Sequence, residues 1–182
     1  MKFYTLKSEK ESEKKDVYTK VVYTYKMIEE RELKEKYARS FYKDKPDDFI
    51  NEVVSSVFWA LLKEEECLGL FTVVEDNEDI ARISHFTTYV DLLKTHTSLL
   101  VFFYIGIEKY YIERNYKSIV AEIPDIDVLR PIHRFFKKLK FSQINVYTGK
   151  DERYFYFMKS NLKEYYTEKD GELIPNIIYK NK

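Results

Sequence analysis

Residues 57–90 read VFWALLKEEECLGLFTVVEDNEDIARISHFTTYV, and this stretch decides the fold. It contains three runs of apolar, aromatic and β-branched residues, separated by charged turns at 63–66 and 75–79. Such runs joined by short polar turns are typical of an antiparallel meander. Residues 57–62 also read as a continuation of a preceding helix, but the acidic turn that follows them favours a hairpin.

A long helix at residues 98–115 follows the meander. Its first half has almost no polar face, so we expect that half to be buried. The other elements predicted are strands at 1–6, 18–27, 118–123, 143–148 and 154–158, helices at 29–43, 47–55 and 127–140, and a C-terminal hairpin of 165–168 with 173–179. Asp47 or Asp48 is the expected cap of the second helix, and Pro131 is tolerated in the first turn of the last.

We expect one core to bury residues from these apolar runs. They are Leu61, Leu70, Phe71, Ile83, Leu100, Phe103, Ile119, Val120 and Phe136.

The composition predicts one globular domain, residues 1–182, and excludes several functions. Lys and Arg together number 31, as do Asp and Glu, so no overall basic field attracts nucleic acid. Three histidines and one cysteine show no metal-ligand spacing, and we expect no metal site. Cys67 lies in a strand-like run and is expected to be a small buried hydrophobe rather than a reactive thiol.

Two stretches predict where the protein resides. Residues 7–16 are almost wholly charged, which argues against a signal peptide. The longest apolar run, 99–107, is shorter than the about 20 residues that span a bilayer. We therefore expect a cytoplasmic protein with no membrane association.

The order of elements resembles that of the GNAT superfamily of N-acetyltransferases. The likeness covers about residues 18–159, with 160–182 as an extension. Two short motifs agree: residues 67–71, CLGLF, match the family's "ivGf" strand context, and residues 136–141, FKKLKF, stand where the family has "lYeklGF".

The resemblance implies an α/β (α+β) domain with a mixed, mostly antiparallel central sheet flanked by helices. It also implies an acyltransferase, most simply an N-acetyltransferase, that takes acetyl-CoA as co-substrate and a small-molecule or peptide amine as acceptor. The alternative is a catalytically silent protein of the same fold that binds a protein or a small ligand. The sequence leaves open the acceptor, and whether the chain is a monomer or a homodimer.

The family's pyrophosphate loop, with its glycines, opens the long central helix. Here that stretch has no glycine, and the residues that the resemblance assigns to the cofactor are Tyr89, Val90, Lys94, Thr95, His96, Thr97 and Ser98. Lys94 can replace the family's arginine, and the hydroxyls can donate to phosphate. Equally, this stretch reads as a plain loop with a helix cap at Thr97 or Ser98.

Three residues are candidates for the chemistry. In many family members the tyrosine of "lYeklGF" protonates the leaving thiolate, but Phe136 stands there and has no ionisable proton, so Tyr147 is a candidate substitute. His85 lies in the third strand of the meander and has a pKa suited to base work. Glu122 lies near the end of the next strand, where α/β sheets place ligands. For both, a purely structural role is the competing interpretation.

Overall fold

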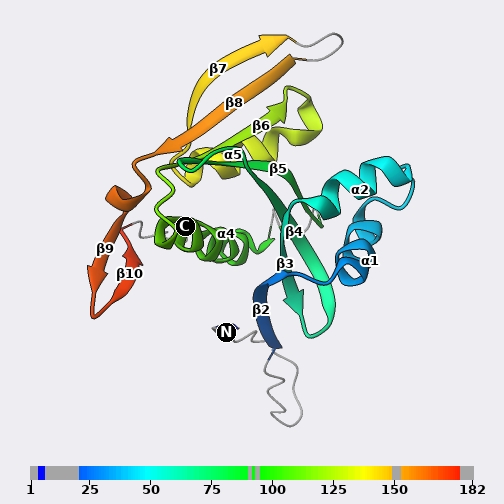
Figure 1. Cartoon of the computed structure of the whole chain (residues 1–182), viewed down its shortest axis with the longest axis horizontal. Coiled ribbons are helices and arrows are strands. Elements are labelled where there is room, and N and C mark those ends of the chain that lie inside the picture. Colours follow the sequence, from blue (N-terminus) through cyan, green and yellow to red (C-terminus); the bar gives the residue numbers. More distant parts are fainter. Residues whose placement is uncertain (1–3, 7–20, 90–91, 93–94, 149–152, 177–182) are drawn as a thin grey trace, which may run out of the picture.

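A large sheet forms the centre of the molecule, and helices cover both of its faces (Figure 1). The computed structural model describes residues 4–6, 21–89, 92, 95–148 and 153–176. The elements are β1 Tyr4–Leu6, β2 Val21–Ile28, α1 Arg31–Phe41, α2 Asp47–Ser55, β3 Val57–Lys63, β4 Glu66–Glu75, β5 Ile80–Thr88, α4 Thr97–Glu113, β6 Ser118–Pro124, η1 Asp127–Leu129, α5 Arg130–Lys138, β7 Ser142–Thr148, β8 Arg153–Ser160, η2 Leu162–Tyr165, β9 Tyr166–Lys169 and β10 Glu172–Pro175.

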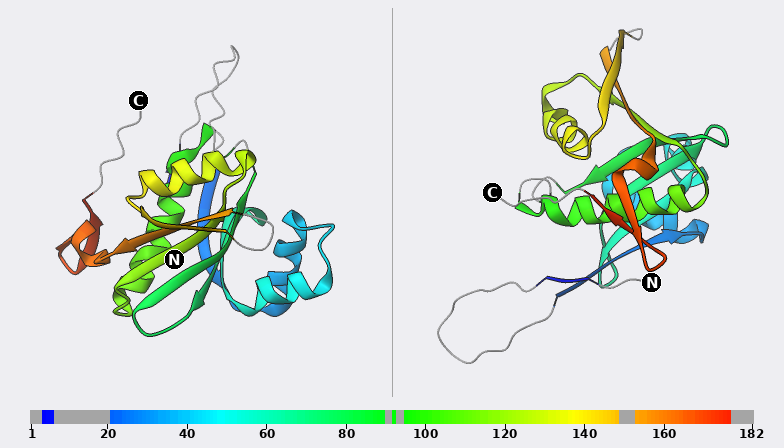
Figure 2. Two further views of the ribbon diagram at one scale, coloured as in Figure 1. Left: turned by 90° about the horizontal axis from the view of Figure 1, so that it is seen from above. Right: turned by 90° about the vertical axis from the view of Figure 1, so that its left-hand side faces the viewer.

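The eight strands of this sheet lie in the order β1-β2-β3-β4-β5-β6-β8-β7. Every neighbouring pair is antiparallel except β5 and β6, which are parallel. Strands β9 and β10 form a separate hairpin, at the opposite end of the molecule from α1 and α2 (Figure 2). The predicted meander is confirmed as β3, β4 and β5, and so is the mixed, mostly antiparallel sheet.

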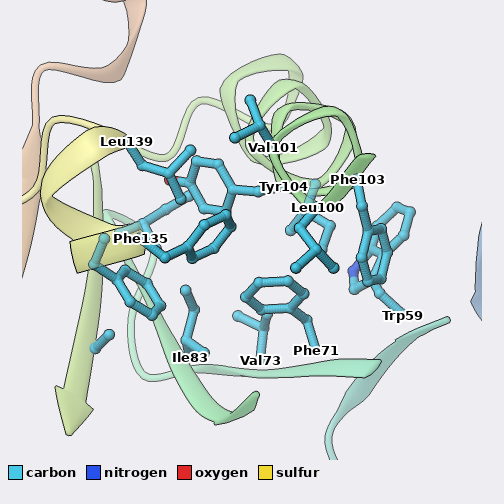
Figure 3. Packing of buried hydrophobic residues seen from close by; sticks show 14 of the residues in the cluster. Trp59, Phe71, Val73, Ile83, Leu100, Val101, Phe103, Tyr104, Phe135 and Leu139 are labelled. Atoms are coloured by element: carbon cyan, nitrogen blue, oxygen red, sulfur yellow. The ribbon is translucent and has the colours of Figure 1, made fainter. Parts of the chain in front are cut away.

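The sheet has a hydrophobic cluster on each face rather than the one core expected. The smaller cluster joins α1 and α2 to one face, and the larger joins α4 and α5 to the other. Figure 3 shows Phe71, Val73 and Ile83 of the larger cluster pointing from the strands toward the helices. All the residues predicted to be core are buried, but Leu70 lies in the smaller cluster while its neighbour Phe71 lies in the larger. Successive strand residues point to opposite faces, so one run of apolar residues supplies both clusters.

Two predicted helix boundaries need correction. Helix α2 has Pro46 at its N-cap, so Asp47 and Asp48 are first-turn residues, where a carboxylate still stabilises the helix dipole. The helix predicted for 127–140 is divided into the 3₁₀ turn η1 and α5, with Pro131 in the first turn of α5 as expected.

Helix α5 ends in a Schellman motif, in which the amide of Phe141 donates to the carbonyl of Phe136 and that of Lys140 to Lys137. The rings of Phe136 and Phe141 pack with centroids 4.9 Å apart, which supplies the apolar contact of that motif. Lys140 must adopt a left-handed conformation here, with φ of 69°. The family phrase has glycine at this position, and glycine adopts such a conformation without strain.

We predict that Lys140→Gly stabilises the protein. Left-handed backbone costs a non-glycine residue about 1–2 kcal/mol, and the extra flexibility of glycine in the unfolded chain takes back about 0.5–1 kcal/mol. Urea denaturation should therefore show a gain of up to about 1 kcal/mol in the free energy of unfolding. The matched control is Lys138→Gly in the last turn of α5, which should lose about 0.5–1 kcal/mol. A loss for both variants would contradict the motif.

A buried ion pair joins α4 to the C-terminal part of the chain. Lys159 Nζ lies 2.6 Å from Glu108 Oε1, and both side chains are almost fully buried. The hydroxyls of Tyr104 and Tyr166 donate to the Glu108 carboxylate at 3.1 and 2.6 Å, and the ammonium lies 4.3 Å from the ring centroid of Tyr165. Burial lowers the pKa of Lys159, and the adjacent carboxylate opposes that shift. The network therefore fixes residues of η2 and β9 against the main domain.

We predict that Lys159→Met alone is strongly destabilising, by about 3–5 kcal/mol, because it leaves the Glu108 carboxylate buried without its counter-ion. Adding Glu108→Gln removes that charge, keeps an oxygen acceptor for one tyrosine hydroxyl and presents an amide N–H that the other hydroxyl oxygen can accept. The double variant should therefore recover at least about 1 kcal/mol of the loss, measured by denaturant unfolding. Equal stability of the single variant and the unmodified protein would show that the pair is not a buried charge pair.

Candidate active site

Strands β5 and β6 begin as partners and then diverge. Their parallel pairing runs from Ile80–Ser118 to Ile83–Ala121. Beyond that point β5 continues along β4 to Thr88, while β6 continues along β8 to Pro124. We call this divergence the β5–β6 fork. A strand paired on one side directs alternate backbone N–H and C=O groups to the other side, so β5 presents such groups toward the fork.

A β-bulge in β5 lies at the start of the fork. Thr72 of β4 pairs with His85, whereas the next residue, Val73, pairs with Ile83, so Ser84 is an extra residue in β5. Ile83 and Phe86 consequently both pack on the α4/α5 face. Ser84 and His85 both reach the opposite face, where Thr72 Oγ1 lies 2.7 Å from Ser84 Oγ and 3.1 Å from His85 Nδ1.

His85 lies among aromatic rings contributed by the C-terminal end of α1 and by α2. The ring centroids of Phe49 and Tyr42 lie 5.2 and 6.4 Å from that of His85, both edge-on. Burial lowers the pKa of His85, the Glu52 carboxylate partly opposes that shift, and Arg82 adds to it. The imidazole is therefore neutral and able to accept a proton at neutral pH.

Glu122 projects from β6 on the same face of the sheet as Arg82 and His85. It pairs in register with Tyr156 of β8, and burial together with the Glu122 charge raises the pKa of Tyr156. Arg82 makes a two-point ion pair with Asp76, at 2.8 and 3.1 Å. The fold thus places the predicted candidates Glu122 and His85 on one face of the sheet. Tyr156, which stays protonated, lies beside Glu122.

Helix α4 begins at Thr97, close after the end of β5. His96 is its N-cap residue and makes no side-chain capping bond, so the predicted cap at Thr97 or Ser98 is wrong. The first turn contains no acidic residue, which leaves the positive end of the helix dipole compatible with an anion. Thr95 and His96 contact each other, with Oγ1 and Nδ1 2.7 Å apart.

The remaining predicted site residues have different outcomes. Tyr89 is 43% exposed and packs against Phe41, with ring centroids 5.1 Å apart. Val90 and Lys94 lie outside the described residues. Tyr147 belongs to β7 and pairs in register with Tyr154, but its side chain is outside what the structure describes. The structure therefore does not test Tyr147 as an acid.

Phe136 is fully buried and is part of the larger core. Its ring lies 6.2 Å from Phe86 of β5 and 6.3 Å from Phe157 of β8, measured between centroids. The position of the family's tyrosine is thus close to the β5 side of the fork. In this chain the Phe136 ring occupies that position and contributes to packing of the core.

Sequence reasoning missed Tyr42, Phe49, Thr72 and Ser84 around His85, and it missed Tyr156 beside Glu122. A bulge has no distinct signal in the sequence around Ser84. The aromatic residues at 41, 42 and 49, clustered about a polar turn, are the one feature that marks an unusual surface there.

The described structure also bears on the reactivity of Cys67, on metal binding and on membrane-spanning helices. Cys67 is buried, and burial raises the pKa of its thiol to about 12, which confirms it as an inert hydrophobe. Among the residues described, no three His, Cys, Asp or Glu side chains are grouped so as to hold a metal ion. Within the same ranges, none of the helices has the length and apolar character to cross a bilayer.

Solved structures share this arrangement across most of the chain. A protein assigned to the GNAT family of acetyltransferases, from Desulfovibrio desulfuricans, superposes with a TM-score of 0.61 at 13% identity, covering 76% of this chain and 98% of its own. Ard1 from Thermoplasma volcanium gives 0.62 at 14% identity over 76% and 97%. The chain has the GNAT fold.

An aminoglycoside 6′-N-acetyltransferase solved in complex with coenzyme A is also similar, with a TM-score of 0.60 at 12% identity, covering 75% of this chain and 96% of that protein. Neither protein-family models nor curated protein sequences give a match. The relationship is therefore visible in the GNAT fold and not in the sequence. At these identities the likeness establishes the architecture and leaves activity to be tested.

We predict that two variants move the pKa of His85 in opposite directions. Phe49→Ala exposes the imidazole to water and should raise its pKa toward the usual value of about 6.5. Glu52→Gln removes a charge that favours the imidazolium, so it should lower the pKa further. Histidine NMR titration measures both, with His133 in the same spectra as the internal control. Shifts of the same sign in the two variants would contradict the environment described for His85.

Proposed function

We propose that this protein is an acyl-CoA-dependent N-acyltransferase, most simply an N-acetyltransferase, whose acceptor is a small-molecule or peptide amine. The observation that supports this most concerns the bulged strand β5. Its backbone groups face the β5–β6 fork, and the same strand carries the neutral, partly buried His85. Coenzyme A bound to an aminoglycoside acetyltransferase of the same fold supports the choice of donor.

Acetyl-CoA as donor fits two features of this chain. The start of α4 lacks acidic residues in its first turn, so its dipole and amide groups favour a diphosphate. The Thr95, Thr97 and Ser98 hydroxyls, and the Tyr89–Val90 end of the β5 run, are the proposed contacts, with Lys94 as a counter-charge. Because this stretch has no glycine, we assign to side chains some of the diphosphate contacts that backbone amides make in the family.

His85 is the proposed general base. Its neutral imidazole accepts the proton of the acceptor ammonium, directly or through water, and the freed amine attacks the thioester carbonyl. A backbone N–H of β5 polarises that carbonyl and stabilises the negative charge that develops on its oxygen. As the C–S bond breaks and the carbonyl re-forms, the attacking nitrogen releases its remaining extra proton to water, which leaves a neutral amide, and the thiolate takes up a proton. Glu122 is the second candidate for the base.

The donor of that last proton differs from the family pattern, because Phe136 has no proton to give. Tyr147 and Tyr156 are the candidates. Tyr156 is protonated at neutral pH, since burial and Glu122 both raise its pKa. A thiolate that leaves unaided and is protonated by water requires neither residue.

The second candidate function is a catalytically silent protein of the GNAT fold that binds a ligand or another protein. Two observations favour it: the buried phenylalanine at position 136 and the missing glycines before α4. The two functions differ in turnover, and binding of the donor alone does not separate them.

We predict that acetyl-CoA at 100 times its dissociation constant stabilises the fold by about 2.7 kcal/mol, seen as a rise in melting temperature. With an accepted amine, release of free thiol should fall in His85→Ala or Glu122→Gln by about 10²–10⁴-fold, whichever residue is the base. The melting shift should persist in that variant. The control His133→Gln changes a histidine on α5 whose Nε2 contacts the carbonyl of Pro124 at the end of β6, and it should leave transfer largely intact.

If His85 is the base, kcat/KM should fall only as pH drops below about 6.5, because its pKa is lowered from that value. A melting shift with acetyl-CoA but no thiol release with any amine would establish the silent alternative. No shift at millimolar acetyl-CoA would remove the donor from the proposal.

A further inference from the structure

The surface around His85 has a composition that the acyl transfer itself does not require. Three rings, those of Tyr42, Phe49 and His85, pack edge-on at centroid distances of 5.1, 5.2 and 6.4 Å. We call this group the aromatic cluster. All three side chains are partly exposed, so each has ring surface left to contact a ligand.

The aromatic cluster is anchored to β5 rather than resting on a loose connection. The Tyr42 hydroxyl shares a hydrogen bond with Thr87, and burial raises the pKa of Tyr42 to about 12, so the hydroxyl stays protonated. His85 is held by Thr72, as described above. Rings fixed in this way on two elements form a preorganised surface, which binds a ligand at a smaller entropic penalty than a mobile one.

One face of the aromatic cluster already contacts a cation. Lys45 Nζ lies 5.5 Å from the centroid of the Phe49 ring, the geometry of a cation–π contact. The Glu52 carboxylate acts on His85 from α2. Lys45 already lies on that ring, so the Glu52 carboxylate beside His85 is the group that favours a ligand ammonium.

Neighbouring arginines pair with two further carboxylates in this region. Asp47 pairs with Arg39 at 2.5 Å, and Asp76 pairs with Arg82 at 2.8 Å. In the connection between α1 and α2 and the first turn of α2, the charges of Lys43 and Lys45 balance those of Asp44 and Asp48. The region thus combines aromatic surface with little net negative charge. A polycation such as an aminoglycoside needs several uncompensated carboxylates, and this balance disfavours it.

We propose that the acceptor is a single primary amine carried on an aromatic or comparably apolar body, which packs on the aromatic cluster while the amine faces His85. This inference rests on the proposed function. This preference for an apolar amine would distinguish the chain from the aminoglycoside acetyltransferases that share its fold. The preferred acceptor depends on the side chains at positions 42, 49 and 85 and not on the fold.

The test compares amines that differ in one feature. 2-Phenylethylamine and ethylamine present the same ammonium with and without a ring, while kanamycin, spermidine and a lysine-containing peptide supply the polycationic and peptide classes. In the acetyl-CoA assay, 2-phenylethylamine should have a kcat/KM at least about tenfold above that of ethylamine, the effect expected from burying a ring. It should also exceed each member of the other classes.

Variants assign that preference to the aromatic cluster. Phe49→Ala should lower the ratio of kcat/KM for 2-phenylethylamine to kcat/KM for ethylamine by about tenfold or more, because a change in the pKa of His85 affects both amines alike, and Phe49→Leu should lower that ratio less. The matched control is Phe102→Ala, a partly buried phenylalanine on α4 that packs on Tyr25; it should not change the ratio of the two amines. Melting temperatures verify that each variant is folded.

A second readout does not depend on turnover. Saturation-transfer NMR should detect 2-phenylethylamine bound to the unmodified protein and a weaker signal with Phe49→Ala. If no amine is acetylated but this signal depends on Phe49, the ligand class stands and the transferase function is overturned. If an aminoglycoside, polyamine or peptide is acetylated more efficiently, the transferase stands and this inference is overturned. Equal binding of both small amines, with no transfer, overturns both.

Discussion

Strand β5 has one residue more than β4 opposite the pair Thr72–Val73, and the candidate site depends on that residue, Ser84. Ser84 and His85 point to the same face of the sheet. The residues that follow Ser84 therefore lie on the opposite face from the one that strict alternation would give them. Phe86 joins the apolar α4/α5 face, and His85 joins Thr72 on the α1/α2 face. If strict alternation continued through Ser84 without a bulge, His85 would point to the α4/α5 face and Phe86 would take its place beside Phe49. A bulge also increases the local twist of the strand, which agrees with the separation of β5 from β6 directly after it.

The molecule contains two kinds of buried titratable group, and their surroundings explain their different roles. Lys159 and Glu108 are nearly inaccessible and satisfy each other together with two tyrosine hydroxyls. Such a pair fixes structure, and a substrate would have to displace it to reach either charge. His85 is only partly buried; that burial lowers its pKa and keeps the ring neutral, while Thr72 holds its Nδ1. It is therefore His85, and not the lysine, that is suited to exchange a proton with a ligand.

The fold was largely predictable because its signals are local. Runs of β-branched and aromatic residues mark β2 through β5, and apolar residues without a polar face mark α4. The errors occur where a local signal is ambiguous. Pro46 takes the N-cap of α2 in place of Asp47, and Leu70 packs away from Phe71 although both lie in one run. His85 and Glu122 were chosen separately by residue type and position, and only the sheet shows that they project on the same face.

The sequence by itself determined the order and type of the elements, since the spacing of apolar residues depends on neighbours a few positions away. It also determined that position 136 carries no proton for a thiolate. What surrounds His85 depends on the tertiary structure, because its partners come from the end of α1, from α2 and from β4 and meet only when the strands take their register. A shift of one residue in that register moves every following side chain to the other face of the sheet, and no pattern near Ser84 reveals such a shift.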